Sequence, residues 1–438
     1  MSDAPDMRPG NTFRLLNSAT PNSCTARLGR LVLPGRRLIE TPSYTALTSR
    51  GCVPHLTPDN LSKHTSLGTA YMALEDFVER RDPPIYEAPP GGNGRLHSFT
   101  ALPSDRATIL AARRCPPVLA PMGNSRKAVT LFTSTGFSSV TVAEFADAAK
   151  RLRPDVIVAL GDTLHTSTTP SSRKQVRMTE RTEDWLDEFL HHLGGRRGCS
   201  EMGIAVFAPV LPVEFPLQWN YLRHLAEDVT YELSGLAIYD VRILPDLVGY
   251  PSLSPLPKLS LDVPKTPHEV LRQVALGVDI CTIPFINSAS DAGVALTFTF
   301  PPPPAAGKAE PMGLNMWSPD HAASLRPLLE ACPCYACTQH HRAYLHHLLS
   351  AKEMLGWSLL QIHNQHVVGD FFAGVRRSLG HGVAYFEQGI EDFARAYEAV
   401  LPEGSGERPR ARGYHFKSEA GQEKINNPSW TDLAADPA

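Results

Sequence analysis

The sequence lacks long hydrophobic runs, and this absence argues against a membrane-spanning protein. No stretch of its 438 residues approaches the roughly 18 consecutive apolar residues that a spanning helix needs. Residues 1–11 carry Asp3, Asp6 and two prolines before any apolar run, unlike a secretory signal or an arginine-rich transit peptide. We therefore expect no transmembrane segment, and any membrane association should be peripheral.

Cysteine and net charge are also scarce. Eight cysteines, three of them clustered, suit a reducing compartment better than a disulfide framework. A formal net charge of −3 gives no general attraction to nucleic acid, so RNA contact would need a local basic patch. The five cysteines outside the cluster are expected to be core or loop thiols: Cys24, Cys52, Cys115, Cys199 and Cys281.

One cluster of side chains has a chemistry that its spacing can name. Cys332, Cys334 and Cys337 lie within six residues, and Pro333 imposes a turn that brings their sulfurs together. His363 follows later and can complete a tetrahedron around Zn²⁺. Four protein ligands leave no position for water, so the spacing predicts one structural zinc ion rather than a catalytic one.

Two alternatives to this zinc site remain open. The thiols could be ordinary buried cysteines, because several other histidines crowd the same region by chance. His341 could replace His363 as the fourth ligand, which would make a knuckle on a short loop. With His363 as ligand, the ion would instead tie a separate helix to the cysteine loop.

Short β-rich runs alternate with amphipathic segments, which predicts an α/β fold with a parallel sheet and crossover helices. The expected helices are 142–152 and 185–193, the second capped by Thr182. No glycine-rich phosphate loop follows the early strands, so a closed (β/α)8 TIM-type barrel is favoured over an open doubly wound sheet. The expected strands are 117–121, 138–142, 156–160, 204–210, 235–241 and 278–285.

Breaks in composition divide the chain. A proline-rich connector at 299–307 cannot lie inside a helix or a central strand. We expect an N-terminal extension at 1–23, the main part of the barrel at 24–300, an inserted C-terminal zinc-binding subdomain with closing helices at 301–402, and a polar, disordered tail at 403–438.

One helical face is predicted near the C-terminus. It should pack against the body of the protein, with a partner interface as the alternative. Its members are Phe386, Ile390, Phe393, Tyr397 and Val400.

Several strings accompany the cysteine cluster: Glu40-Thr41-Pro42, Pro154-Asp155-Val156, Gly277-Val278-Asp279, Gly293-Val294-Ala295 and Ile362-His363-Asn364. With them, the chain resembles the tRNA-guanine transglycosylases over most of residues 24–380, and within that family its non-catalytic members. The resemblance implies a (β/α)8 barrel with an inserted zinc subdomain. It also implies exchange of a guanine in tRNA for a modified base, queuine at the wobble position.

The same resemblance implies that the catalytic groups are missing. In catalytic relatives an aspartate nucleophile follows Gly-Val-Asp by three positions in a Phe-Asp pair, and these positions are Cys281 and Thr282 here. Asp279 is an odd offset from Thr282 on a predicted strand, so it should point to the opposite face. Misalignment of these strings by one or two residues is the alternative.

Further positions of the family's pocket differ as well. The purine-recognising aspartate would align with Gly161, leaving Asp162 one position off. The residues 211–213, Leu-Pro-Val, replace an expected glutamine-glycine string. An Asp-Ser-Gly-Gly-Phe-Gln string that follows the second barrel strand in the enzymes does not occur in the sequence.

These differences favour a non-catalytic subunit that pairs as a heterodimer with a catalytic queuine tRNA-ribosyltransferase subunit and acts with it on tRNA. The alternatives are an active transglycosylase with a relocated nucleophile and a zinc-stabilised barrel that binds RNA or protein without such a partner. The resemblance suggests a cytoplasmic location with peripheral attachment to the outer mitochondrial membrane. Direct RNA contact would use Arg173, Lys174, Arg177 and Arg181, unless these form only a solvated charge run.

Overall fold

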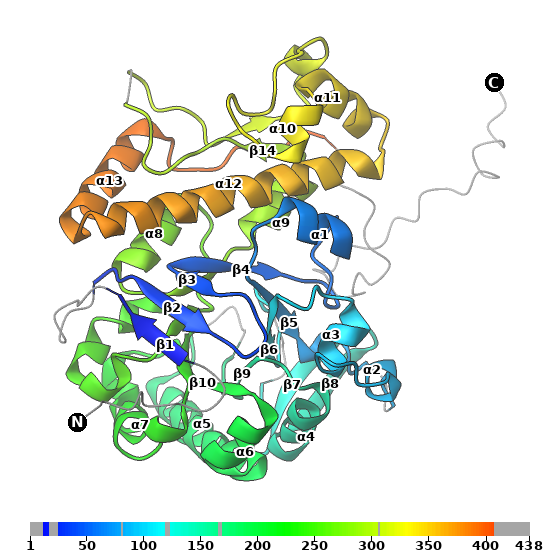
Figure 1. The fold of residues 1–438 in the computed structure, drawn as a ribbon. Helices are drawn as coiled ribbons and strands as arrows, with labels where there is room; N and C mark the ends of the chain where they lie inside the picture. The colour runs from blue at the N-terminus through cyan, green and yellow to red at the C-terminus, as the bar shows by residue number, and fades with distance from the viewer. Residues whose placement is uncertain are drawn as a thin grey trace, which may run out of the picture.

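The computed structural model describes residues 12–16, 25–79, 82–118, 123–164, 169–304 and 307–406. Eight parallel strands form a closed barrel in the order β10-β11-β12-β13-β4-β5-β6-β9, which confirms the predicted TIM-type fold (Figure 1). The barrel strands are β4 (Ser43–Leu47), β5 (Thr69–Ala73), β6 (Ala107–Ala111), β9 (Val156–Val158), β10 (Ala205–Val210), β11 (Gly235–Ile238), β12 (Lys258–Ser260) and β13 (Ile280–Thr282).

Alternate residues of these strands fill the barrel interior. Ile109, Phe207 and Ile280 lie in one buried cluster, and neighbours such as Leu110 and Cys281 face the surrounding helices. The ring of Phe207 leaves no room at Gly235 on the next strand, where a Cβ atom would lie 2.5 Å from it. The interior is therefore a packed core, and any ligand site must lie at one end of the barrel.

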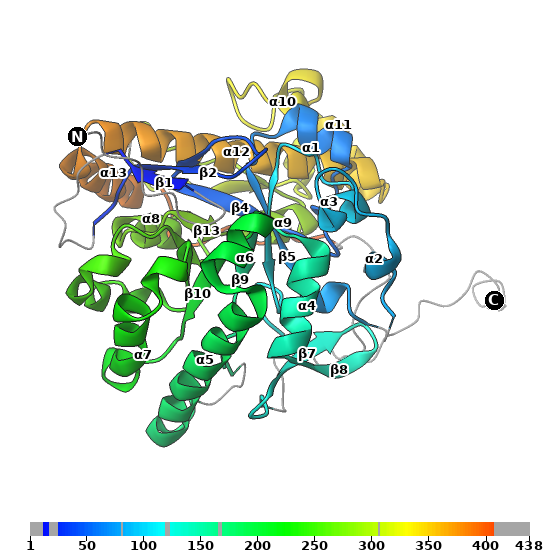
Figure 2. The same ribbon diagram turned by 60° about the horizontal axis from the view of Figure 1, so that its bottom comes forward.

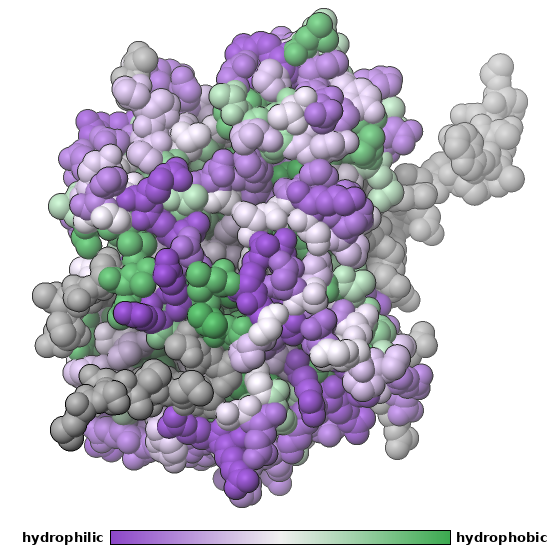
Figure 3. All heavy atoms as spheres, viewed as in Figure 1, coloured by the Kyte–Doolittle hydropathy of each residue, from purple (hydrophilic) through white to green (hydrophobic). Residues whose placement is uncertain are grey.

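A small antiparallel sheet covers the N-terminal end of the barrel. It has the order β1 (Thr12–Leu15), β2 (Gly29–Val32) and β3 (Ile39–Thr41). Leu31 and Ile39 join the interior cluster, while Val32 and Leu38 are about half exposed. Figure 3 shows a mostly hydrophilic face with apolar residues gathered over this sheet.

Helices surround the barrel on its outer side. They are α1 (Pro58–His64), α2 (Pro84–Glu87), α3 (Arg95–Thr100), α4 (Val142–Leu152), α5 (Ser172–Leu193), α6 (Gly195–Met202), α7 (Phe215–Glu227), α8 (Pro267–Ala275) and α9 (Phe285–Asp291). A hairpin of β7 (Ala128–Thr133) and β8 (Gly136–Thr141) and the start of α5 extend at the same end of the barrel (Figure 2).

The C-terminal part packs against one side of the barrel. It contains β14 (Val294–Leu296), β15 (Gly313–Asn315), α10 (Tyr335–Gln339), α11 (Arg342–Ser350), α12 (Met354–Gly380) and α13 (Val383–Ala396). The 27-residue helix α12 contacts α9, β14, α10, α11 and α13, so it joins the barrel to the cysteine loop (Figure 1). Among the described residues, no helix has the length and apolar character needed to cross a bilayer.

Some strand predictions were wrong. Gly136–Thr141 is a strand, but it pairs with β7 in the hairpin and takes no part in the barrel. The expected strand at 117–121 is absent at 117–118, and 119–121 lie outside the described residues.

The predicted N-cap of the second helix was also wrong. The helix α5 begins at Ser172, so Thr182 lies inside it, where its hydroxyl donates to Met178 O. The predicted face near the C-terminus packs as expected at Phe386, Phe393 and Tyr397, which are buried. Val400 lies beyond the end of α13 and is 65% exposed.

Several expectations concern residues outside the described part of the chain. The absence of a signal peptide was predicted from residues 1–11, and the disordered tail includes residues 407–438. Cys24 also lies outside it. Of the other thiols expected in the core or loops, Cys52 is exposed, and Cys115, Cys199 and Cys281 are buried.

Candidate metal site and barrel mouth

The four predicted zinc ligands converge in the C-terminal part. Their ligand atoms lie within 4.8 Å of one another. His363 Nδ1 is 3.9 Å from Cys332 Sγ, 3.5 Å from Cys334 Sγ and 3.4 Å from Cys337 Sγ. A tetrahedron with ordinary Zn–S and Zn–N bonds has S···N edges of about 3.5 Å, so this arrangement fits a zinc ion.

Local structure orients each ligand. Cys334 is the N-cap of α10 and its sulfur accepts from the Cys337 backbone N–H, which places both sulfurs on one side of the turn. His363 lies in the middle of α12 and is fully buried. Its Nε2 lies 2.8 Å from Leu296 O, so Nε2–H donates to that carbonyl and Nδ1 is left to face the sulfurs.

A neighbouring side chain fixes the same helix. Asn364 Oδ1 accepts from Leu296 N, and its Nδ2 donates to Ser290 Oγ and to Val294 O. His341, the alternative fourth ligand, instead caps α11 by accepting from Tyr344 N. The site is therefore built by His363 on a helix that is bonded directly to β14.

The barrel mouth, where the carboxyl ends of the strands meet, is a second candidate site. A cavity of about 270 Å³ opens there. Its lining includes Arg113, Cys115, Gly161, Pro212, Tyr239 and Asp262. In barrels of this kind, active sites lie at this face.

Thr282 ends β13 and is fully buried beside this mouth. Its hydroxyl donates to Ser260 O at 3.0 Å and accepts from Cys115 Sγ at 3.4 Å. Cys281 faces the helices, and burial raises its pKa well above the ordinary value. Neither residue at the position of the family's nucleophile carries or contacts a carboxylate through these bonds.

Asp279 lies at the opposite end of the strand and serves a structural contact. Its carboxylate accepts from Arg27 Nε at 3.0 Å and from Lys258 N at 2.7 Å. Arg27 also donates to Leu256 O, and both charged side chains are buried. The ion pair therefore joins the N-terminal segment to the barrel wall.

The carboxylates after the second barrel strand are equally engaged. Glu75 accepts from the backbone N–H of Arg114 and Phe132, and Asp76 accepts from Arg114 Nε and Arg50 N. Burial raises the pKa of Glu75 and of Asp76, and the Arg114 charge opposes both rises. These side chains hold the β7–β8 hairpin to the mouth.

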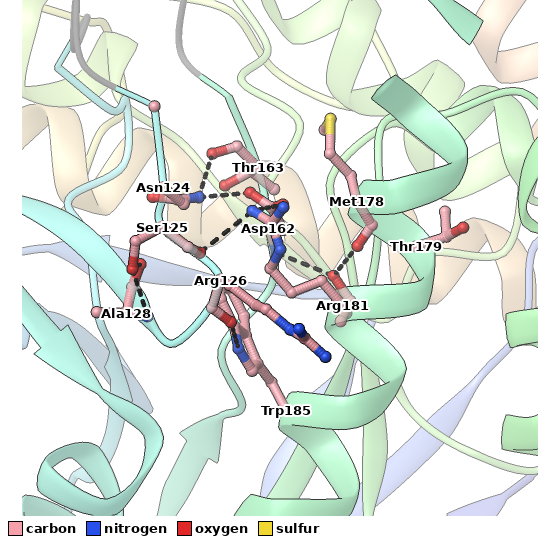
Figure 4. Close-up of polar contacts among 12 residues, drawn as sticks. Asn124, Ser125, Arg126, Ala128, Asp162, Thr163, Met178, Thr179, Arg181 and Trp185 are labelled. Carbon is pink, nitrogen blue, oxygen red and sulfur yellow. Dashed lines mark hydrogen bonds and ion pairs between the residues drawn. The ribbon is translucent and has the colours of Figure 1, made fainter. Parts of the chain in front are cut away.

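A side chain at Gly161, where the resemblance places the purine-recognising aspartate, would crowd its neighbours. A Cβ atom there would lie 3.1 Å from Pro209 Cβ and 3.2 Å from Leu211 Cδ2. The next residue, Asp162, turns away to Asn124 Nδ2 and Arg181 Nη1, each 2.7 Å from its carboxylate (Figure 4). Gly161 therefore lines the cavity without a carboxylate, and the carboxylate of Asp162 is bonded to other protein groups.

The predicted RNA contacts all lie on α5 near the mouth. Arg173, Lys174 and Arg177 are exposed, whereas Arg181 is half-buried and paired with Asp162. The sequence reasoning missed Asp262, whose pKa is raised by burial and lowered by a bond from Val241 N, with a net rise. Asp262 lies just after β12 at the mouth, but this three-residue strand was not predicted, so no signal in the sequence identified it.

Comparison with known proteins agrees with this geometry. A family model described as queuine tRNA-ribosyltransferase matches residues 22–399. A Schizosaccharomyces pombe protein named queuine tRNA-ribosyltransferase accessory subunit 2 is 33% identical, covering 91% of this chain and 87% of its own length. Proteins of the same name from Xenopus tropicalis and Culex quinquefasciatus are each 29% identical, covering 82% of this chain and 94% and 86% of their own lengths. The chain belongs to the queuine tRNA-ribosyltransferase family.

Proposed function

We propose that this protein is a non-catalytic subunit of a queuine tRNA-ribosyltransferase complex, pairing with a catalytic subunit as a heterodimer. The observation that carries the proposal is the bonding of Thr282, whose hydroxyl is held by Ser260 O and Cys115 Sγ. Base exchange through a covalent intermediate needs a nucleophile activated by a nearby base, and this position has neither a carboxylate nor such a base. The names of the relatives support the accessory role.

In this proposal, the Cys332, Cys334, Cys337 and His363 side chains hold one structural zinc ion per chain. The ion supplies a cross-link between the cysteine loop and α12, and no step of base exchange passes through it. Since α12 also packs on α9 of the barrel, the zinc subdomain stays in a fixed orientation for a partner. A catalytic subunit of the same fold can present a matching surface, which favours a pseudo-symmetric dimer.

The tRNA would contact the exposed cations at the start of α5. Arg173, Lys174 and Arg177 lie beside the mouth, where a barrel of this family would bind a substrate. Replacing all three by glutamate should weaken tRNA binding by the complex and lower its salt slope by about three, because each phosphate contact contributes about one. An unchanged affinity and slope would leave these residues as a solvated charge run.

The function itself is tested by labelled guanine exchange into tRNA. The purified chain alone should give no exchange and trap no covalent RNA adduct. Addition of a catalytic relative should give exchange that depends on the aspartate of that relative and exceeds the rate of the relative alone. Equal rates with and without this chain would contradict the accessory role and favour a zinc-stabilised barrel with another function.

One variant addresses the relocated-nucleophile alternative directly. Asp262 is the strongest candidate for a relocated nucleophile, because it lines the cavity and has a raised pKa. Asp262→Asn should leave exchange by the complex unchanged if the chain is non-catalytic. A loss of exchange together with a covalent adduct on the wild-type chain would show that Asp262 acts as nucleophile.

Cytoplasmic location and attachment to the outer mitochondrial membrane stay predictions from the family resemblance.

A further inference from the structure

Asp162 is the centre of a bonded cluster that has no role in the proposed function so far. Its carboxylate accepts from Asn124 Nδ2 at 2.7 Å and pairs with Arg181 Nη1 at 2.7 Å (Figure 4). Its backbone N–H donates to Thr182 Oγ1 at 2.9 Å. The side chain is only 1% exposed. One residue therefore connects β9, the loop before β7 and the middle of α5.

The same helix fixes a tight turn in that loop. Ser125 N donates to Ala128 O at 3.0 Å, and Ala128 N donates to Ser125 Oγ at 3.0 Å. From α5, Arg181 Nη1 donates to Ser125 O at 3.2 Å and Trp185 Nε1 donates to Arg126 O at 3.1 Å. We call this set of contacts around Asp162 the clamp.

The two residues at the tip of the turn are cations. Arg126 and Lys127 are both exposed, and neither forms an ion pair within the described part of the chain. Their backbone is held by the clamp while their side chains face solvent. Fixing the backbone lowers the entropy that must be lost when these side chains bind an anion.

The turn contacts α5 at Arg181 and Trp185, which follow the cationic start of that helix. Burial raises the pKa of Asp162, and the bond from Asn124 opposes that rise. The charges of Arg181, Arg113 and Lys174 oppose it too, so Lys174 lies within electrostatic reach of the clamp. Since the Asp162 carboxylate is buried and paired, Arg126 and Lys127 are the exposed charges of the turn itself.

We propose that Asp162 is a positioning residue, which holds the 125–128 turn on α5 so that Arg126 and Lys127 extend the cationic surface of α5 and bind RNA phosphates. This inference rests on the proposed function only in taking tRNA as the ligand. Phosphates recur along an RNA strand, so exposed cations on a bonded backbone can contact them, and phosphate contacts position a protein without reading sequence. An acidic protein surface is the competing ligand, and the test separates it.

The test measures tRNA binding by the full chain, alone and with the catalytic relative, as a function of salt. Arg126→Ala with Lys127→Ala should lower the salt slope by about two, about one per phosphate contact. The matched control is Lys150→Ala with Arg153→Ala. It removes two exposed charges at the C-terminal end of α4 and should leave the salt slope unchanged. Wild-type binding by the turn variant would overturn the proposal.

Asp162→Asn separates a positioning role from an effect of net charge, because the two predict opposite changes in RNA affinity. Removing a negative charge should strengthen RNA binding if only net charge matters. If the carboxylate holds the turn, binding should weaken and the slope should fall toward that of the turn variant. Tighter or unchanged binding by Asp162→Asn would therefore refute the positioning role.

A second readout follows the clamp itself without RNA. Trypsin cleavage after Arg126 and Lys127, quantified by mass spectrometry, should accelerate in Asp162→Asn and stay unchanged in the Lys150 and Arg153 control. Equal cleavage in the wild type and Asp162→Asn would overturn the clamp. If the turn variant loses heterodimer assembly but keeps tRNA affinity, the ligand is the acidic partner surface. Guanine exchange by the wild-type complex tests the accessory function separately from these measurements.

Discussion

The candidate zinc site and the barrel mouth differ in whether their polar atoms converge on one point or are each bonded to other protein groups. At the zinc site, three sulfurs and one imidazole nitrogen converge, and the contact from His363 Nε2 to Leu296 O turns Nδ1 toward the sulfurs. At the mouth, the Thr282 hydroxyl, the Glu75 carboxylate and the Arg113 guanidinium are bonded to other protein groups. Ligand atoms that converge on one point indicate a binding site. Polar groups that are hydrogen-bonded to other protein groups indicate a structural role.

The largest effect is expected from a substitution in the candidate zinc site. Cys334→Ser should abolish zinc binding and unfold at least the C-terminal subdomain, because structural zinc contributes about 10–16 kcal/mol in small peptides. Metal analysis and thermal unfolding measure both consequences. Cys52→Ser is the matched control, because Cys52 is an exposed thiol outside the cluster. Unchanged zinc content in Cys334→Ser would contradict the site.

A smaller effect tests whether the carboxylate nearest to Thr282 in sequence is structural. Asp279→Asn leaves the buried guanidinium of Arg27 without its counter-charge, which should lower the free energy of unfolding by about 3–5 kcal/mol. Denaturant unfolding measures the loss. Asp147→Asn is the control, because its ion pair with Arg151 is exposed and contributes about 0–1 kcal/mol. Loss of exchange in a correctly folded Asp279→Asn complex would instead indicate a catalytic carboxylate.

A third cluster, on the surface between α5 and α7, is exposed although its polar side chains are bonded to one another. His224 lies 2.9 Å from Asp187 and 3.0 Å from Asp228. Burial lowers the pKa of His224, but the hydrogen bonds that its ring donates to both carboxylates raise the pKa more, so the net shift is upward. The stabilisation is therefore fully present below the ordinary histidine pKa of about 6.5 and is lost as pH rises through the raised value.

The expected size of that pH effect is below about 1 kcal/mol, because solvent screens the cluster. His224→Gln should remove this part of the decline in stability with rising pH, as measured by thermal unfolding across a pH series. A steeper decline in His224→Gln than in the wild type would contradict the sign.

The sequence predicted that Cys332, Cys334, Cys337 and His363 would converge, because three of them are neighbours and thiolates are specific metal ligands. It predicted barrel strands where apolar runs were long, as at Ala205–Val210. It missed β4, which contains Ser43 and Thr45, and the three-residue β12, because polar residues and short length hide a strand from periodicity. It also missed β5 and β6, whose five residues are all buried and so show no alternation of apolar and polar side chains.

Other features depend on contacts between distant residues. Thr182 has the residue type of a helix cap, yet its hydroxyl accepts from Asp162 N and donates within α5. The strand Gly136–Thr141 pairs with its neighbour in a hairpin, because the preceding turn brings β7 beside it. Arg181 was grouped with exposed cations, and its partner Asp162 could be identified only once both elements were placed.

In the proposed complex, Thr282 takes no part in base exchange. The most direct measurement is the rate of labelled guanine exchange by the complex carrying Thr282→Ala, beside a complex whose catalytic partner lacks its own aspartate. We expect a nearly unchanged rate in the first complex and no exchange in the second. Loss of exchange in Thr282→Ala, or a covalent tRNA adduct on the wild-type chain alone, would contradict it.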